Sequence, residues 1–403
     1  MRSFLRAGHL PTLLACLTHF ETSFMLWTLV GALGVLIAAD LGLSPSEKGL
    51  LVGVPLLGGA LWRVPVGFLA DQLGAKRVGV ATIFASLLPL ALAWRVASDL
   101  PGLFGVGLLL GIAGSSFATA LPLASRCYPA RYQGTAMGIA AAGNSGAVVA
   151  NLVAPRLGEA VGWQGVFGLA LIPALLAGLL FVALARDDTV PQRVIEPLRV
   201  RASAFGEADL WWLCLLYSMT FGGYAGLASF LPIFFHDQYG IPAIAAGGLV
   251  AACAVAGSLA RPIGGMLADR LGGVPVLAAV DALVPAALLA PSMAAPLAPT
   301  VVALVVAMAC LGLGNGAVFR LVPQRFAGRI GVATGVIGAA GGVGGFLLPT
   351  LLGLQKELSG SYGPGFATFA LSLAVMFLCV KALESGWRFT WLSTESGQEA
   401  DRV

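Results

Sequence analysis

Long apolar stretches separated by short polar segments dominate this chain. A membrane-spanning helix needs about 20 consecutive, mostly apolar residues, and about twelve such stretches fit the sequence. They are far longer than the roughly ten-residue alternating segments of a β-barrel. The pattern therefore predicts an all-α membrane protein with twelve transmembrane helices, at about residues 10–38, 48–70, 78–97, 101–125, 134–158, 164–185, 209–236, 243–268, 274–293, 299–322, 329–355 and 365–383.

The composition supports a membrane protein over a soluble one. Hydrophobic residues make up 58% of the chain and charged residues 10%, whereas a soluble domain carries about 25% charged residues. The six cysteines are scattered, without a CxxC pair or a Cys/His cluster, so we expect neither a metal nor a cofactor. The glycine repeats lie inside apolar helices without a preceding strand, which argues against a dinucleotide site and an enzyme.

Basic residues fall mostly on one set of the predicted loops. One set includes Lys76, Arg77, Arg126, Arg186, Arg270 and Arg325, and the opposite set carries Lys48, Arg95, Arg156 and Lys356. The positive-inside rule then puts both termini in the cytoplasm, in a multi-pass protein of the inner (plasma) membrane. Because topology accounts for the net charge of +4, no nucleic-acid partner is expected. The first apolar run lacks a convincing cleavage site, so we expect it to remain as a span.

One long polar stretch inside the chain divides the spans into two sets of six. The predicted parts are an N-terminal half at 1–185, a cytoplasmic linker at 186–208, a C-terminal half at 209–383 and a cytoplasmic tail at 384–403. The halves repeat, because Arg261 follows Arg63 by 198 residues and GAAGGVG at 338–344 follows AAAGNSG at 140–146 by the same 198. The unchanged spacing predicts two pseudo-symmetric six-helix halves.

These two arginines stand inside apolar runs, where a charge is costly. A charge near the bilayer centre costs roughly 2.5–3.5 kcal/mol, so a chain that repeats Arg63 at Arg261 is expected to use both. Few intramembrane acids are available for a salt bridge, chiefly Glu21 and Asp281. Snorkelling toward a helix end also fits poorly, since each arginine lies about two turns before the next loop. We therefore expect the guanidinium groups to hold an anion, and their planar fork suits a planar oxyanion better than a lysine does.

Glycine-rich stretches occur at equivalent places in the fifth and eleventh spans. Small residues at four-residue spacing allow close helix packing, and this reading applies to most of these glycines. We also expect Gly143 and Gly146 in one half, and Gly341 and Gly344 in the other, to let helices move over one another. Asn144 differs, because a lone amide among glycines can donate to an oxyanion.

The loops after the second and eighth spans resemble a signature of the major facilitator superfamily. The two stretches are GFLADQLGAKR at 67–77 and GMLADRLGG at 265–273. Parallel repeats of six helices, with the substrate held between them, are typical of that superfamily. The resemblance implies packing and gating roles for Gly67, Asp71, Gly265 and Asp269, and it says almost nothing about the substrate.

A narrower resemblance covers nearly the whole chain. GNSGAVVANLVAP and GAAGGVGGFLLP resemble the two nitrate signatures of the nitrate/nitrite porter family, and LLYSMTFGGYAGLASFLPIFF and GLGNGAVFRLVPQRF agree with it. The resemblance implies an anion clamp made by Arg63 and Arg261, one from each half. The other substrate-binding residues that it implies are Tyr217, Phe221, Phe117, Asn144 and an aromatic residue of the first span, which is Phe24 or Trp27.

The residues of the first span leave open whether transport is coupled to protons or to exchange of a second anion. Glu21 and His19 lie near its expected midplane and could carry a proton in symport, whereas exchange of one anion for another needs no such group. Toward the outer face, we expect Glu47 and Lys48 in a loop and Asp237 solvated at the end of the seventh span.

The sequence thus predicts a monomeric twelve-span transporter, working in a lipid bilayer on nitrate and nitrite by exchange or proton symport. A porter for another small anion is the nearest alternative. A larger substrate would need a wider pocket than these aromatics leave. A non-transporting sensor on the same fold would normally need an additional cytoplasmic domain.

Overall fold

The computed structural model describes residue 4 and residues 7–186, 203–326 and 330–387, and in these ranges helices account for nearly all of the chain. The first half contains α2 (Leu10–Ala32), α3 (Gly34–Leu41), α4 (Pro45–Leu73), α5 (Ala75–Ala85), α6 (Leu87–Arg95), α7 (Leu100–Gly114), α8 (Phe117–Arg126), α9 (Ala130–Ala141), η1 (Ala142–Ser145) and α10 (Gly146–Leu184). The second half contains η2 (Ser203–Gly206), α12 (Ala208–Tyr239), α13 (Ala243–Leu271), α14 (Gly273–Ser292), α15 (Leu297–Arg325), α16 (Ile330–Ser359) and α17 (Gly363–Trp387).

Twelve membrane crossings are confirmed. Eleven stretches of the described chain are long and apolar enough to cross a membrane. One of them, Thr135–Leu184, contains two predicted spans, because the backbone leaves the helical conformation at Gly162 (φ 76°, ψ 156°). A positive φ favours glycine, so this residue allows the chain to turn between the two spans.

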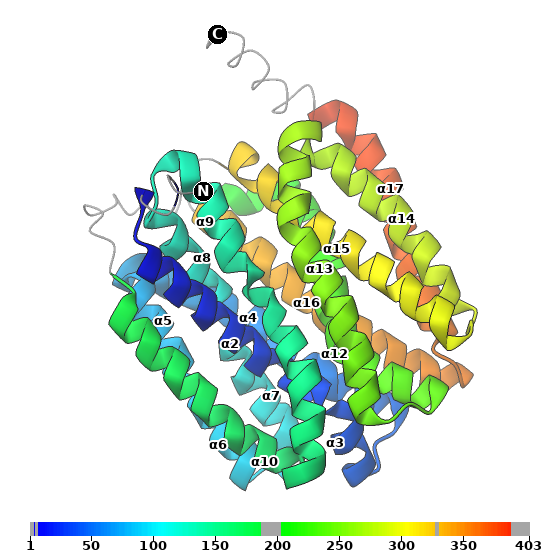
Figure 1. Ribbon diagram of the computed structural model, residues 1–403. Helices are drawn as coiled ribbons and strands as arrows, with labels where there is room; N and C mark the ends of the chain where they lie inside the picture. The colour runs from blue at the N-terminus through cyan, green and yellow to red at the C-terminus, as the bar shows by residue number, and fades with distance from the viewer. Residues whose placement is uncertain (1–3, 5–6, 187–202, 327–329, 388–403) are drawn as a thin grey trace.

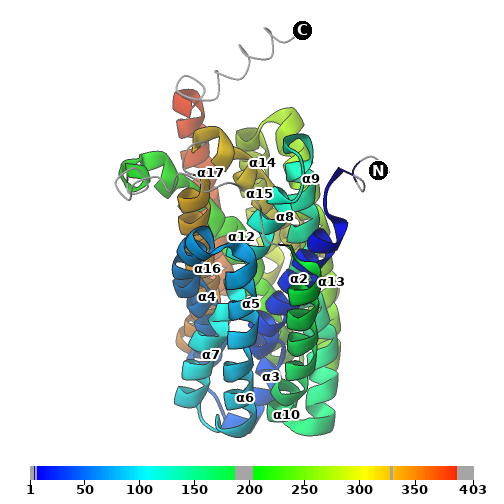
Figure 2. The ribbon, with the colours of Figure 1, turned by 90° about the vertical axis from the view of Figure 1, so that its left-hand side faces the viewer.

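The helices form two bundles that lie side by side, with the start of α2 and the end of α17 toward the same end of the molecule (Figure 1). Seen from the side, the helices run along one long axis (Figure 2). Most of the predicted linker at 186–208 and the tail beyond Trp387 lie outside the described residues. We call the end where α2 begins and α17 ends the terminal end, and the other, where α4 and α13 begin, the closed end.

Glycine contacts repeat from one half to the other. A Cβ atom on Gly146 of α10 would overlap the carbonyl oxygen of Glu21 in α2, and a Cβ atom on Gly344 of α16 would overlap that of Ser218 in α12. The fifth span therefore packs on the first span as closely as the eleventh packs on the seventh. This agreement supports the pseudo-symmetry that the 198-residue spacing predicts.

At the closed end, each half packs against the other through a matching pair of helices. A Cβ atom on Gly49 of α4 would lie 2.5 Å from the carbonyl oxygen of Pro349 in α16. In the same way, Gly247 of α13 lies directly on the carbonyl oxygen of Asn151 in α10. Gly247 follows Gly49 by 198 residues, and Pro349 follows Asn151 by the same number. The pseudo-symmetry therefore extends to the contact between the halves.

Two expectations about the outer charged residues were wrong. Glu47 and Lys48 lie in the first turn of α4 rather than in a loop, because Ser44 and Glu47 form a capping box in which each bonds the backbone N–H of the other. Asp237 is not simply solvated, since its carboxylate lies 2.8 Å from the Lys48 ammonium of the other half.

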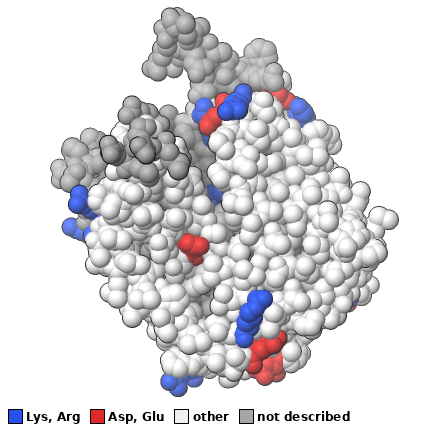
Figure 3. Space-filling view, viewed as in Figure 1, with Lys and Arg blue, Asp and Glu red and all other residues white. Residues whose placement is uncertain are grey.

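The outward faces of the helices suit a lipid environment. Large apolar side chains are exposed on many helices, including Leu61, Leu176, Leu259, Val302 and Leu371. Figure 3 shows that the middle of one face is almost free of charge and that most charged side chains lie toward its ends. A band of this kind matches the hydrocarbon core of a bilayer.

Candidate functional site

Arg63 lies at the centre of the molecule and is 2% exposed. Its Nε donates to the Gly114 carbonyl oxygen at the end of α7 (3.0 Å), and its Nη1 donates to the Gly338 carbonyl of α16, in the other half. The guanidinium carbon also lies 5.0 Å from the ring centroids of both Trp27 and Phe221. Within the described ranges this buried charge has no carboxylate partner, and it is surrounded by carbonyls and aromatic faces, which stabilise a cation.

Arg261 approaches the same centre from α13. It is 6% exposed, and its Nη1 is buried without a hydrogen-bond partner among the described residues. The Phe117 ring centroid lies 5.8 Å from the Arg261 guanidinium carbon and 5.7 Å from that of Arg63. One aromatic ring therefore joins the two predicted arginines, which come from opposite halves of the chain.

Further aromatic rings from both halves close the centre. Tyr217 and Phe221 of α12 stack at 5.0 Å with nearly parallel rings, and the buried Tyr217 hydroxyl lies beside the Arg261 guanidinium. Phe24 of α2 lies edge-on to Phe221 at 6.4 Å, while Trp27 lies nearly parallel to it at 6.3 Å. Both first-span candidates border the centre, and Trp27 is the one beside Arg63.

Phe319 of α15 is an aromatic residue of the centre that the sequence did not single out. Its ring lies 5.3 Å from Phe117 and 4.9 Å from Tyr217, edge-on to the latter. The position 198 residues earlier is Leu121, so the repeat gives no signal for it. The only signal available was its place in the stretch GLGNGAVFRLVPQRF.

Asn144 lies in η1, the short 3₁₀ segment between α9 and α10. It is 1% exposed and its Oδ1 has no partner among the described residues. This segment packs against α2 and against α13, the helix that carries Arg261. A 3₁₀ stretch inside a longer helix often marks a functional hinge, and the anion-binding role of Asn144 stays a prediction.

The two protonatable residues of the first span face different surroundings. The Glu21 carboxylate is half-buried and accepts a hydrogen bond from the Ser145 hydroxyl (3.0 Å), next to Asn144 in η1. His19 is fully buried within its own half, with Nε2 3.0 Å from the Gly79 carbonyl oxygen of α5. Glu21 is therefore the closer of the two to a predicted site residue, and both proton-coupling roles stay predictions.

The predicted packing glycines divide into two groups. Gly143 borders Phe20 and Gly341 borders Tyr217, at hypothetical Cβ distances of 2.8 Å and 2.6 Å, so both make room for first- and seventh-span side chains. A Cβ atom added to Gly265 would meet no other atom within 4 Å, and one added to Gly67 would meet only the Ala118 side chain at 3.7 Å, among the described residues.

The two motif aspartates make ion pairs inside their own halves. Asp71 lies 3.5 Å from Arg126, and Asp269 pairs with Arg320. Both pairs join neighbouring helices at the terminal end. Their gating role stays a prediction.

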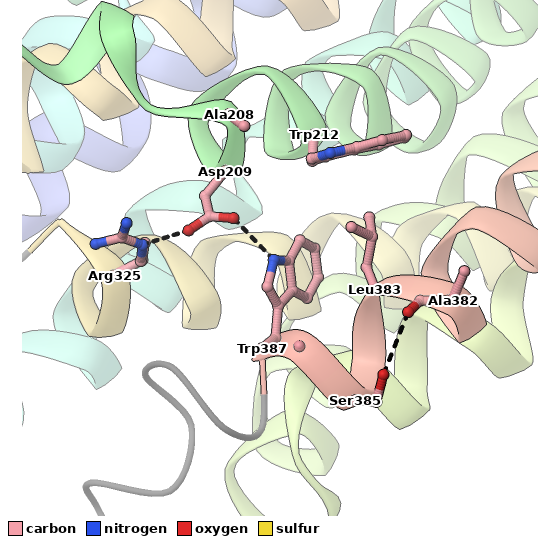
Figure 4. Close-up of a pocket in the computed structure, with 9 residues that line it drawn as sticks. Ala208, Asp209, Trp212, Arg325, Ala382, Leu383, Ser385 and Trp387 are labelled. Atoms are coloured by element: carbon pink, nitrogen blue, oxygen red, sulfur yellow. Dashed lines mark hydrogen bonds and ion pairs between the residues drawn. The ribbon is translucent and has the colours of Figure 1, made fainter.

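A pocket of about 460 Å³ lies away from this centre, between α12, α15 and α17 at the terminal end (Figure 4). Asp209 occupies one wall, where it accepts from Arg325 Nε (2.5 Å) and from Trp387 Nε1 (2.8 Å). Glu207 pairs with the same arginine at 2.7 Å. Since Arg325 already has two carboxylate partners, this pocket is a poor candidate for an anion site.

The chain is similar to known proteins over most of its length. Residues 15–349 match the Major Facilitator Superfamily. The "Nitrite extrusion protein" of Bacillus subtilis is 32% identical over 89% of this chain and 90% of its own, and the "Probable nitrate/nitrite transporter NarK2" of Mycobacterium tuberculosis is 36% identical over 83% and 86%.

A solved structure shares the fold at lower identity. It is a bacterial homolog of the human lysosomal transporter Spinster in an inward-facing, occupied conformation, with a TM-score of 0.69, 19% identity and coverage of 94% of this chain and 97% of that one. With the two six-helix bundles, the sequence match and these relatives, the chain belongs to the Major Facilitator Superfamily of membrane transporters, and within it to the family of nitrate and nitrite transporters.

Proposed function

We propose that the protein moves nitrate and nitrite across the plasma membrane by alternating access, as a monomer with both termini in the cytoplasm. The observation that carries the proposal is the meeting of Arg63 and Arg261, from opposite halves, around the single ring of Phe117. The names of the two bacterial relatives support the choice of anion.

The chemistry of the centre fits a small planar oxyanion. Arg261 has a buried Nη1 without a partner among the described residues, and the Tyr217 hydroxyl lies beside the same guanidinium. Aromatic faces exclude water, which strengthens charge-assisted hydrogen bonds and favours a flat, weakly hydrated anion. The anion would take the place of the Gly338 carbonyl at Arg63 and bridge the two guanidinium groups.

Bridging by the anion links transport to cargo. Two nearby positive charges oppose closure of the halves around an empty centre, and an anion between them removes that repulsion. Exchange of nitrate for nitrite follows directly from such a clamp. Proton symport requires in addition a group that carries the proton, for which Glu21 is the candidate.

Counterflow in proteoliposomes tests this function. Vesicles containing the purified protein and internal nitrite should take up labelled nitrate faster than vesicles with internal chloride or sulfate, and an imposed pH gradient shows whether protons also drive uptake. Uptake that neither internal nitrate nor internal nitrite accelerates, with or without the gradient, would contradict the proposal.

A further inference from the structure

We propose that Trp27 is a positioning residue, which holds the Arg63 guanidinium in place before the anion arrives. The proposal rests on the proposed function and deepens it, because it makes the two arginines of the clamp unequal. Arg63 would be a prearranged cation and Arg261 the arginine with an open donor.

Trp27 is itself held rigidly. Its indole N–H donates to the Pro55 carbonyl oxygen of α4 at 2.7 Å, and the side chain is 1% exposed. The ring fills a slot between two glycines, since a Cβ atom on either Gly59 or Gly114 would lie 2.5 Å from an indole carbon. The hydrogen bond and the two glycine surfaces together fix the position and the orientation of the ring.

Arg63 is bound to the same slot. Gly114 borders the indole, and its carbonyl oxygen accepts the hydrogen bond from Arg63 Nε at 3.0 Å. The guanidinium carbon lies 5.0 Å from the indole centroid, within the range of a cation–π contact. Two independent contacts therefore tie the position of the guanidinium to the place that Trp27 occupies.

Trp27 also connects Arg63 with the other half. The indole lies nearly parallel to the Phe221 ring of α12, at 15° and 6.3 Å, and Phe221 is again 5.0 Å from the guanidinium carbon. The guanidinium thus contacts aromatic rings of both halves. The orientation of the guanidinium toward Phe117 is fixed before an anion enters, so less side-chain entropy is lost when the anion binds.

The C-terminal half has an equivalent ring with a different task. Tyr224 follows Trp27 by 197 residues and lies against Gly257, which follows Gly59 by 198. The Tyr224 hydroxyl is bonded to Ser258 (2.7 Å) and Ala254 (3.2 Å) inside its own half. Since the two slots correspond, Tyr224 is a matched control for the loss of a buried ring.

The test compares Trp27→Leu, Trp27→Phe and Tyr224→Leu in the full-length protein. Binding of nitrate and of nitrite is measured by calorimetry, and KM and the maximal rate by counterflow. Trp27→Leu should raise both Kd and KM at least about tenfold, as expected from the loss of a desolvated cation–π contact. Trp27→Phe keeps an aromatic face, so its Kd should stay within about threefold of the wild type, as should that of Tyr224→Leu.

Each outcome has a definite reading. An unchanged Kd in Trp27→Leu, or equal losses in Trp27→Leu and Tyr224→Leu, would overturn the positioning role, because both rings would then serve packing alone. If Arg63→Lys loses binding while Trp27→Leu binds normally, the clamp stands and the positioning role falls. A wild-type protein that binds neither anion would refute the proposed function itself. Should Trp27→Leu fail to fold, Trp27→Met replaces it and is read in the same way.

Discussion

At the scale of single residues, the chemistry of the centre depends on the shape of the guanidinium groups. The donors of Arg63 reach two carbonyl oxygens in two directions, at Gly114 and Gly338. A lysine keeps the charge but presents it as a point, so it cannot serve both directions or grip a planar oxyanion with two parallel bonds.

Arg63→Lys and Arg261→Lys should each weaken nitrate binding by about 1.5–3 kcal/mol, the range for hydrogen bonds to charged groups. Calorimetry on the purified variants measures this loss. Arg156→Lys, a change at an exposed closed-end arginine, should leave the affinity unaltered. Near-normal affinity in both central lysine variants would refute the clamp.

Glu21 decides the mode of coupling. If it carries the proton, Glu21→Gln should abolish uptake driven by a pH gradient yet spare nitrate/nitrite counterflow, because the arginines remain intact. Ser145→Ala, which removes the 3.0 Å hydrogen bond to the carboxylate, is the control that retains the acid. Survival of both activities in Glu21→Gln would leave symport without this carrier. Loss of both would assign Glu21 to the structure of the first span.

The sequence predicted that Arg63 and Arg261 lie close to each other, but not the contact partners of the individual residues. The arginines were detectable because charge is rare in apolar runs and because the pair repeats. Phe319 was not, since a phenylalanine in an apolar span carries no signal by itself and Leu121 occupies its repeat position. The partner of Asp237 was equally hidden, because Lys48 reaches it from the other half.

At the scale of helices, close glycine contacts join the first span to the fifth and the seventh to the eleventh. Gly146 and Gly344 each lie directly on a backbone carbonyl of the neighbouring helix. Any side chain there must push two helices apart, and overpacking of this kind costs about 1–3 kcal/mol. Each of these helix pairs lies within one half, and its spacing also affects the position of η1 in the first half and of Tyr217 in the second.

Gly146→Ala and Gly344→Ala should therefore lower thermal stability and reduce counterflow strongly, whereas Gly138→Ala and Gly335→Ala should do neither. The control glycines lie in the same spans but have open space where a Cβ would go. Melting temperature and counterflow rate are measured on all four variants. Equal behaviour of the two pairs would contradict a packing role for the contact glycines.

Leucine at Gly143 or Gly341 should stop transport, because it would meet Phe20 or Tyr217 at the centre. Surface expression should persist, since the rest of each helix is unchanged. Counterflow and membrane yield are measured together. Normal transport would show that the transport cycle does not depend on the close contacts at these two glycines.

Helix boundaries were less predictable than helix existence. Length and hydrophobicity suffice to predict the twelve crossings. The interruptions at Leu33, Ser86 and Ser115 lie inside long apolar runs. A glycine or serine stands at or beside each of them, but such residues also occur within the unbroken helices, so they do not mark a boundary by themselves.

At the scale of the whole molecule, the repeat was the most informative feature of the sequence. A spacing of 198 residues relates the arginines, and the structure extends it to Gly49 and Gly247 at the contact between the halves. What the repeat could not reveal is which end of the molecule is closed. That depends on pairs that have no repeat counterpart, such as Lys48 with Asp237.

The charged contacts at the closed end should hold the halves together there. Lys48 of α4 lies 2.8 Å from Asp237 of α12, whose carboxylate also accepts from the Tyr362 hydroxyl at 2.8 Å, and the Ser46 N–H donates to Glu357 at 2.9 Å. Burial, together with the Asp237 charge, raises the pKa of the Tyr362 phenol, so this hydroxyl remains a donor at physiological pH. Opening of this end must break the Lys48–Asp237 and Ser46–Glu357 contacts, which join the two halves, whereas Tyr362 and Asp237 both belong to the C-terminal half.

Lys48→Met and Asp237→Asn should each shift the population toward molecules that are open at this end, by about five- to thirtyfold for a loss of about 1–2 kcal/mol. Spin labels at Val96 and Leu358, which are exposed at this end in opposite halves, report the opening as a longer distance by pulsed electron resonance. Exchange of the two charges, Lys48→Asp with Asp237→Lys, should restore the short distance. Lys381→Met removes a pair that lies within α17 alone, so it should change nothing. An unaltered distance distribution in both single variants would mean that the glycine contacts alone hold this end closed.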